Sequence, residues 1–148
     1  SAAFFDAHFV VISGEDKEAR LTTSAYRVAE GGMEHVAVRG VRSTAAFLRD
    51  ASKRIITIGA EPRARWRIRD LATIVEDRAA ALAKRSGQGK APYRRPGIAL
   101  VVGNEETGLP PEVKDLCSAL VRIPGTGNIE SLNVAQAATL FLHEVFEL

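Results

Sequence analysis

Apolar and polar positions along the chain form short apolar runs separated by longer stretches with helical periodicity. Five apolar runs predict β-strands, at residues 8–12, 34–38, 54–60, 98–102 and 119–123. The periodic stretches between them predict helices, at about 17–32, 43–51, 67–84, 109–117 and 131–148. Strands that alternate with helices indicate an α/β fold, with a mostly parallel sheet and helices on both of its faces.

The helix predicted at 43–51 has a clear start signal. Ser43 or Thr44 is expected to cap it, because either hydroxyl can accept a hydrogen bond from a free N–H of the first turn. Its spacing places Ala46, Phe47 and Ala51 on the inner face.

The helix predicted at the end of the chain is apolar over most of its surface. Its polar positions form a narrow stripe, made of Asn133, Gln136, His143 and Glu147. So much apolar surface on a terminal helix needs cover, either from a second subunit or from deep burial in the monomer. We favour the first and expect a homodimer.

Composition places the chain among globular proteins of one domain, residues 1–148. Hydrophobic residues make up 46% and charged residues 26% of its 148 positions. No apolar run is long enough to span a bilayer, and no secretory signal opens the chain. The single cysteine, Cys117, excludes an internal disulfide; we interpret it as a small buried hydrophobe and expect a cytoplasmic protein.

Positive charge is concentrated in one region. Residues 61–95 hold ten Lys or Arg against four Asp or Glu, a balance of +6, so the other residues sum to −4 within a net charge of +2. A basic surface of this kind suggests a polyanionic partner, RNA first. The alternative is a solvated helix face followed by a mobile loop. The candidate RNA-binding residues are Arg63, Arg65, Arg67, Arg94 and Arg95.

Two loops that directly follow predicted strands, 103–110 and 124–130, are expected to form one pocket, since ligands of such sheets lie beyond the carboxyl ends of the strands. Gly103 and Gly108 have the spacing of a phosphate-binding P-loop. Leu-Pro follows them where a P-loop has Lys and Ser or Thr, and the loop carries Glu105 and Glu106. Two carboxylates would repel a nucleoside triphosphate, so we expect a ligand without phosphates.

Two further stretches of the chain stand out, "ALVVGNEETGL" at 99–109 and "VRIPGTGNIESLNVAQAATLFLHE" at 121–144. They resemble the second and third motifs of the SpoU/TrmH family, within the SPOUT superfamily of RNA methyltransferases. "SAYRVAEGGMEHVAV" at 24–38 is similar to a region upstream of these motifs. The resemblance implies a C-terminal trefoil knot, S-adenosylmethionine as the cofactor, and methyl transfer to a ribose 2′-hydroxyl of tRNA or rRNA.

The resemblance also implies the site residues. The catalytic candidates are Glu105, Ser131 and Asn133, although Glu105 could cap the following turn and Ser131 could be the N-cap of the last helix. Asn104 and Asn128 could likewise be turn residues. The candidates for the cofactor slot are Gly103, Asn104, Gly108, Leu109, Ile123, Pro124, Gly125, Gly127 and Leu132.

The Asn and Arg of the family's first motif are absent from the 148 residues, while "SAAFFDAHFVVI" resembles the part of that motif directly after the Arg. We therefore expect a domain without its first-motif segment, which binds the cofactor better than it catalyses. The alternative is a catalytically impaired or truncated domain that binds cofactor or RNA. A flavodoxin-like nucleotide or signalling domain would explain the alternating elements but not the two motifs together.

Other candidate chemistry is weaker. His8, His35 and His143 lack the spacing of metal ligands, and we expect no metal site. Trp66 lies among the arginines, where it could stack on an unpaired base, although packing is the more common use. The basic stretch at 61–96 lies outside the cofactor motifs and is a candidate for choosing among RNA substrates.

Overall fold

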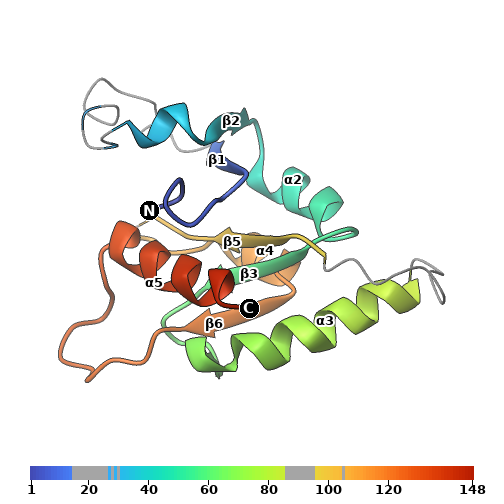
Figure 1. Ribbon diagram of the computed structural model, residues 1–148. Coiled ribbons are helices and arrows are strands. Elements are labelled where there is room, and N and C mark those ends of the chain that lie inside the picture. Colours follow the sequence, from blue (N-terminus) through green and yellow to red (C-terminus); the bar gives the residue numbers. More distant parts are fainter. Residues whose placement is uncertain (15–26, 28, 30, 86–95, 105) are drawn as a thin grey trace.

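A four-stranded parallel sheet lies at the centre of the computed structural model, which describes residues 1–14, 27, 29, 31–85, 96–104 and 106–148. Its strand order is β4-β6-β3-β5. The strands are β3 (Ile56–Ala60), β4 (Trp66–Arg67), β5 (Ile98–Val101) and β6 (Ala119–Arg122). A two-stranded parallel sheet of β1 (Phe9–Ser13) and β2 (Ala37–Val41) lies beyond the β5 edge (Figure 1). The predicted parallel α/β fold is confirmed.

Helices cover both faces of the central sheet. Those described are α2 (Thr44–Ala51), α3 (Leu71–Arg85), α4 (Pro111–Leu116) and α5 (Val134–Phe146), with short 3-10 helices η1 (Gly32–Glu34) and η2 (Ile68–Asp70). In this part of the chain no helix has both the length and the apolar character needed to cross a membrane.

Alternation along the strands divides the core into two layers. Ile58 of β3 points to the face covered by α3 and α5, where Phe141 of α5 is buried against it. Leu120 of β6 points the other way and packs with Leu48 of α2 and Val113 of α4. Because successive side chains of a strand point to opposite faces, a strand with apolar residues at every position can be buried on both sides.

Helix α5 begins three residues later than predicted. Its N-cap is Asn133, whose Oδ1 accepts a hydrogen bond from the Ala135 N–H at 2.9 Å. Ser131 is therefore not the cap, and the chain at 131–132 stays outside the helix. Asn133, two positions further on, is the cap instead, because its own backbone is not helical and its amide oxygen reaches an N–H of the first turn.

The prediction for α2 is confirmed at its start and in part on its inner face, where Phe47 packs against the core as expected. Ser43 caps the helix, since its Oγ accepts from the Ala46 N–H at 3.3 Å. The buried residue is Leu48, 2% exposed, whereas Ala46 is exposed. Contact with α4 decides which face is covered, and Leu48 offers far more apolar area than an alanine.

Strand β2 starts at Ala37, three residues after the predicted start at 34. The 3-10 helix η1 takes up Glu34, and Gly31 before it has a positive φ of 80° that favours glycine. The pairing of Phe9 with Ala37 then sets the register of β1 and β2. Most of the helix predicted at 17–32 lies outside the described residues.

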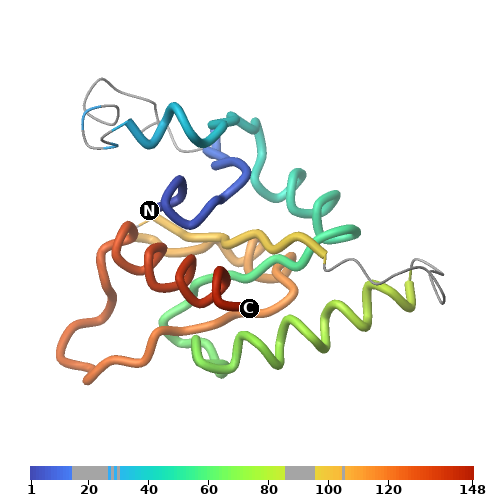
Figure 2. Tube along the Cα trace, viewed as in Figure 1, coloured from blue at the N-terminus to red at the C-terminus, as the bar shows by residue number. Residues whose placement is uncertain are grey.

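The first seven residues pack along α5. The N-terminal end of the trace lies beside α5 in Figure 2. Ser1 Oγ lies 2.6 Å from Thr139 Oγ1, and the Phe5 ring is 6.0 Å from the ring of His143 and 5.9 Å from that of Phe146. Helical spacing places these α5 residues on the side away from Phe141, which faces the core. The N-terminal segment thus covers part of the outer side of α5 and leaves Phe146 59% exposed.

Candidate functional site

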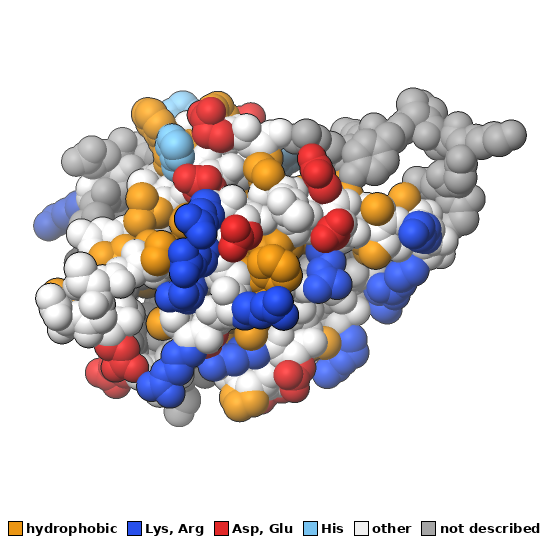
Figure 3. All heavy atoms as spheres, turned by 90° about the horizontal axis from the view of Figure 1, so that it is seen from below, with side chains coloured by type: hydrophobic (Ala, Val, Ile, Leu, Met, Phe, Trp, Pro, Cys, Tyr) orange, Lys and Arg blue, Asp and Glu red, His pale blue; other side chains and the backbone are white. Residues whose placement is uncertain are grey.

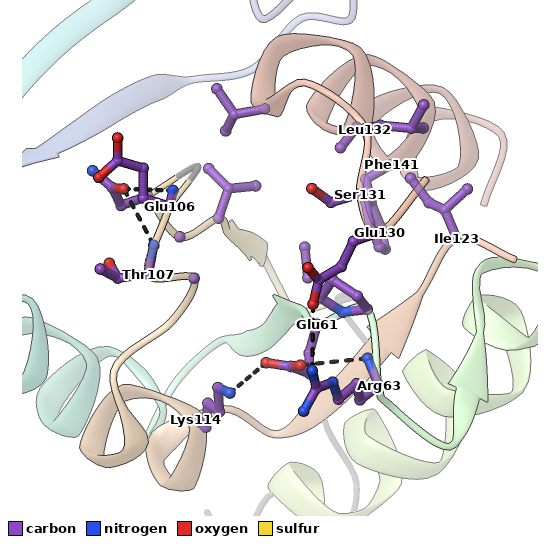
Figure 4. A pocket seen from close by; sticks show the side chains of 18 residues that line it. Glu61, Arg63, Glu106, Thr107, Lys114, Ile123, Glu130, Ser131, Leu132 and Phe141 are labelled. Carbon is purple, nitrogen blue, oxygen red and sulfur yellow. Dashed lines mark hydrogen bonds and ion pairs between the residues drawn. The ribbon is translucent and has the colours of Figure 1, made fainter. Parts of the chain in front are cut away.

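A pocket of about 420 Å³ opens at the carboxyl ends of β3, β5 and β6 (Figure 4). Of the two loops predicted to form it, the loop at 103–110 lines it as expected, whereas the loop at 124–130 contributes only Glu130. These strands are neighbours in the sheet, so the loops that follow them meet at one edge. The lining comes from 60–63, 102–104, 106–108 and 130–132, with Lys114, Ile123, Val134, Ala137 and Phe141.

The loop after β5 is held by its own residues. The Gly108 N–H donates to the Asn104 carbonyl at 2.9 Å, which closes the loop, and the Asn104 Oδ1 accepts from the Glu106 N–H at 2.8 Å. Gly108 has a φ of 68°, a conformation that favours glycine. Gly103 faces the Gly108 backbone so closely that no side chain fits there. At Gly103 the loop therefore presents bare backbone to the pocket, beside the lining residues Asn104, Glu106 and Thr107.

An ion pair forms part of the pocket wall. Glu61, just after β3, and Lys114 of α4 are joined by an Nζ–Oε2 contact of 2.5 Å, and the Arg63 N–H donates to Glu61 Oε1 at 3.3 Å (Figure 4). Burial by itself would raise the pKa of Glu61, but the hydrogen bonds from Lys114 and the Arg63 N–H, with the positive charges of both residues, hold that pKa below its ordinary value. Glu61 is thus ionised at neutral pH.

A second ion pair lies at the pocket rim. Arg63 Nη2 is 3.3 Å from Glu130 Oε1, joining the loop after β3 to the loop before α5. Both side chains are more than 80% exposed, so the pair contributes little to stability. Among the charged lining residues that the structure describes, Glu106 is in no ion pair. The described wall is therefore weakly negative.

The rest of the wall is largely apolar. Ile123, Leu132 and Val102 line it beside the sheet edge, and Phe141 lies at its base. Apolar walls with a few convergent polar groups are typical of sites for small organic molecules, and the volume falls in the usual range.

The pocket brings together seven of the predicted site residues, and the others lie elsewhere or outside the described residues. Those that line it are Arg63, Gly103, Asn104, Gly108, Ile123, Ser131 and Leu132. Pro124, Gly125 and Gly127 lie on the following loop away from the lining, and Asn133 caps α5. Leu109, 4% exposed, packs in the core near α2 and α4. Glu105, Arg94 and Arg95 lie outside the described residues.

Sequence reasoning missed the Glu61–Lys114 pair. The two residues are far apart along the chain, and neither belongs to a recognised motif. The position of Glu61 directly after a buried strand could have indicated a site residue, because that position lies at the ligand-binding edge of a parallel sheet.

Four arginines at alternate positions along β4 and its flanks are called the basic strip: Arg63, Arg65, Arg67 and Arg69. Arg67 is half-buried, and the other three are exposed. The Arg65 guanidinium lies 5.5 Å from the centre of the Trp66 ring, which is 39% exposed. Lys and Arg side chains gather on the face shown in Figure 3, the side on which α3 lies in Figure 1. The strip begins at the pocket rim, because Arg63 belongs to both.

Cys117 has the environment of a structural thiol. It donates to the Val113 carbonyl at 3.3 Å, and burial raises its pKa to about 11. Within the described segments, no group of three or more His, Cys, Asp or Glu side chains could hold a metal ion.

Comparison with known sequences gives consistent matches. The model of the SpoU rRNA Methylase family matches residues 1–143. The chain is 33% identical over 134 residues to the 23S rRNA (guanosine-2′-O-)-methyltransferase RlmB of Acinetobacter baylyi, covering 90% of this chain and 47% of that protein. It is 30% identical over 141 residues to the putative TrmH family tRNA/rRNA methyltransferase YacO of Bacillus subtilis, covering 95% and 48%. The chain thus spans about half the length of these relatives.

Solved structures show the same fold. The SpoU methyltransferase AviRb of Streptomyces viridochromogenes, in complex with AdoMet, superposes with a TM-score of 0.70 at 22% identity, over 99% of this chain and 49% of that one. An AdoMet-bound rRNA methyltransferase of Sinorhizobium meliloti gives a TM-score of 0.70 at 23% identity, over 99% and 48%.

Proposed function

The chain belongs to the SpoU rRNA Methylase family, and on that premise we propose that it is an RNA methyltransferase domain dependent on S-adenosylmethionine. The substrate is a ribose 2′-hydroxyl of tRNA or rRNA. The observation that carries the proposal is that the two family motifs, separate in the sequence, supply opposite sides of one pocket.

The pocket residues fit this cofactor. Its adenine needs apolar walls and backbone hydrogen bonds, which Ile123, Leu132 and the backbone of the loop at 103–108 can supply. The cofactor carries a positive sulfonium and no phosphate, so a carboxylate such as Glu106 is favourable nearby. The carboxylates of the loop and its lack of a phosphate-binding Lys and Ser or Thr argue against a nucleoside triphosphate. Both features are compatible with S-adenosylmethionine.

Ser131 is the catalytic candidate that lines the pocket, and we propose that its hydroxyl helps to place the target ribose. Asn133 would act from the N-cap of α5, where its side chain fixes the start of the helix and thereby the position of Ser131. Glu105 stays a candidate from the family motif. A 2′-hydroxyl attacks readily only when its proton is removed or its charge is stabilised, and polar groups beside the pocket supply that setting.

RNA is the partner that the basic strip fits. Arginines beginning at the pocket rim could hold the phosphates on either side of a nucleotide whose ribose enters the pocket. Trp66, partly exposed beside Arg65, offers an aromatic ring on which a base could stack.

Two further proposals concern assembly and fold. Leu140 and Phe146 of α5 remain 44% and 59% exposed beside the N-terminal segment, in which Phe4 is 83% exposed. This exposed apolar surface supports a homodimer formed through α5 and the N-terminal segment, and the location that we propose for it is the cytoplasm. A trefoil knot in which α5 passes through a loop is proposed from the family resemblance. Sedimentation of the chain tests the dimer, and a monomer at micromolar concentration would contradict it.

Calorimetric titration with S-adenosylmethionine and S-adenosylhomocysteine tests the cofactor site. We expect saturable binding that Leu132→Arg abolishes, because the new charge would enter the pocket. Ile129→Arg is the matched control: Ile129 is 81% exposed in the same loop and does not line the pocket. Equal loss in both variants, or no binding to the folded chain, would contradict the proposal. Methyl transfer is then tested by alkaline cleavage of the RNA product. A 2′-O-methylated nucleotide resists cleavage, because its 2′-oxygen can no longer attack the neighbouring phosphate.

A further inference from the structure

The Glu61–Lys114 pair is held more firmly than an ordinary surface ion pair. Both Glu61 oxygens are engaged, Oε2 by Lys114 Nζ and Oε1 by the Arg63 N–H. The Glu61 side chain is 14% exposed and that of Lys114 34% exposed, and both border the pocket. The pair therefore presents one fixed negative and one fixed positive group on the same wall.

The stability of the fold alone does not explain why these two positions carry charged residues. Partial burial removes water from both charges, and well-packed apolar residues would stabilise the connection between the β3 loop and α4 equally well. Lys114 remains partly exposed and lines the pocket, and its ammonium has three donors, of which the contact with Glu61 uses one. A ligand with charges of both signs could contact the two groups at once.

We propose that Glu61 and Lys114 recognise the zwitterionic amino-acid end of the cofactor, Lys114 contacting its carboxylate and Glu61 its ammonium. This rests on the proposed function, since it assigns one end of the same ligand within the same pocket. The pair is neutral as a whole, so it favours a zwitterion without attracting a simple anion such as phosphate. The apolar residues Ile123 and Leu132 are then left for the adenosine end.

Two ligands separate this role from general cofactor binding. S-adenosylhomocysteine has the amino-acid end, whereas 5′-methylthioadenosine keeps the adenosine and the sulfur but lacks that end. Calorimetry of the 148-residue chain with both ligands is made for the wild type, Lys114→Gln, Glu61→Gln and the charge-conserving Lys114→Arg. Lys53→Gln is the control, because Lys53 is in an exposed ion pair with Asp50 of α2, away from the pocket lining.

We expect Lys114→Gln and Glu61→Gln to weaken S-adenosylhomocysteine binding about tenfold or more, as for a lost charged hydrogen bond, and to change 5′-methylthioadenosine binding less than about twofold. Lys114→Arg should retain most of the affinity, and Lys53→Gln should match the wild type. Thermal unfolding of each variant shows whether it is folded at the temperature of the titration, and the ratio of the two affinities stays informative if a variant is partly unfolded.

Equal weakening for both ligands, or no weakening for either, would overturn the inference and leave the cofactor site standing. A wild-type chain that binds neither ligand would overturn the proposed function and the inference with it. The two failures are therefore distinguishable from the wild-type titrations alone.

Discussion

The backbone of Gly103 lies directly against that of Gly108: a Cβ built on Gly103 would come within 2.2 Å of the Gly108 carbonyl carbon and 2.5 Å of its oxygen. Both atoms belong to the backbone that closes the pocket loop, so they cannot move aside as a flexible side chain could. We predict that Gly103→Ala opens the loop, lowers the free energy of unfolding by roughly 1–3 kcal/mol and abolishes cofactor binding. Thermal unfolding and calorimetry measure the two effects.

Gly125→Ala is the matched control for this change. Gly125 belongs to the other predicted cofactor loop, and a Cβ there would meet nothing within 4 Å. The free energy of unfolding of Gly125→Ala should lie within about 0.5 kcal/mol of that of the wild type. A Gly103→Ala chain as stable and as competent in binding as this control would show that the loop has another arrangement.

Acid should weaken the fold partly through Glu61. Its pKa is lowered in the folded chain from the ordinary value of 4.5, so its contribution to stability is complete above that value and is lost as the pH falls through the lower, folded value. The stability difference between the wild type and Glu61→Gln should therefore be constant at neutral pH and shrink below about pH 4.5. Urea unfolding across a pH series measures this difference.

Glu76→Gln, which removes an exposed carboxylate from α3, is the control for that series. It alters the formal charge by the same amount without touching the pocket pair. A Glu61→Gln difference that does not vary with pH would mean that Lys114 and the Arg63 N–H do not favour the ionised carboxylate.

Cys117 should react slowly with thiol reagents in the folded chain. Burial raises its pKa to about 11 from 9.0, so the thiolate fraction at pH 8 falls about 100-fold relative to the unfolded chain. Exclusion of the reagent by the surrounding core slows the reaction further. The rate with a colorimetric disulfide reagent, measured with and without denaturant, checks this. Comparable rates in the two conditions would show that the helix α4 region opens readily.

The basic strip should carry the salt dependence of RNA binding. Reversing Arg63, Arg65 and Arg67 to Glu should weaken binding and flatten the plot of log affinity against log salt, by up to about 0.7–0.9 in slope for each lost phosphate contact. Fluorescence anisotropy with labelled RNA at several salt concentrations measures both quantities.

A triple reversal elsewhere controls for net charge in that experiment. Arg39, Arg49 and Arg54 lie on β2, on α2 and just after α2, outside the basic strip, and reversing them changes the charge of the chain by the same amount. If both triple variants lose the same affinity and the same salt slope, RNA responds to total charge and the strip is not its docking surface.

The central strands could be predicted closely because their apolar runs are continuous and bounded by turn residues. Ile56–Ala60 and Ala119–Arg122 lie within the predicted ranges, and α4 begins with Pro111 in its first turn as expected. The place of the pocket also followed from sequence, since parallel strands bring the loops after them to one edge.

The remaining features depend on contacts between distant segments. Leu48 is the buried residue of α2 because α4 packs against that side, which the local spacing of alanines does not report. Glu61 and Lys114 meet because β5, the strand before α4, pairs with β3, the strand before Glu61. The start of α5 was misplaced for a local reason, because Ser131 and Asn133 are both good caps and only the backbone conformation decides between them.

The arrangement of the pocket at the ends of β3, β5 and β6 has a consequence for the order of folding. Each of these strands pairs in parallel with a neighbour that is far away along the chain, so each pairing requires the closure of a long loop before any contact is gained. Such pairings are slow to form. The pocket should consequently form late in folding. A refolding chain should regain the circular dichroism of its helices well before it regains the ability to bind a ligand.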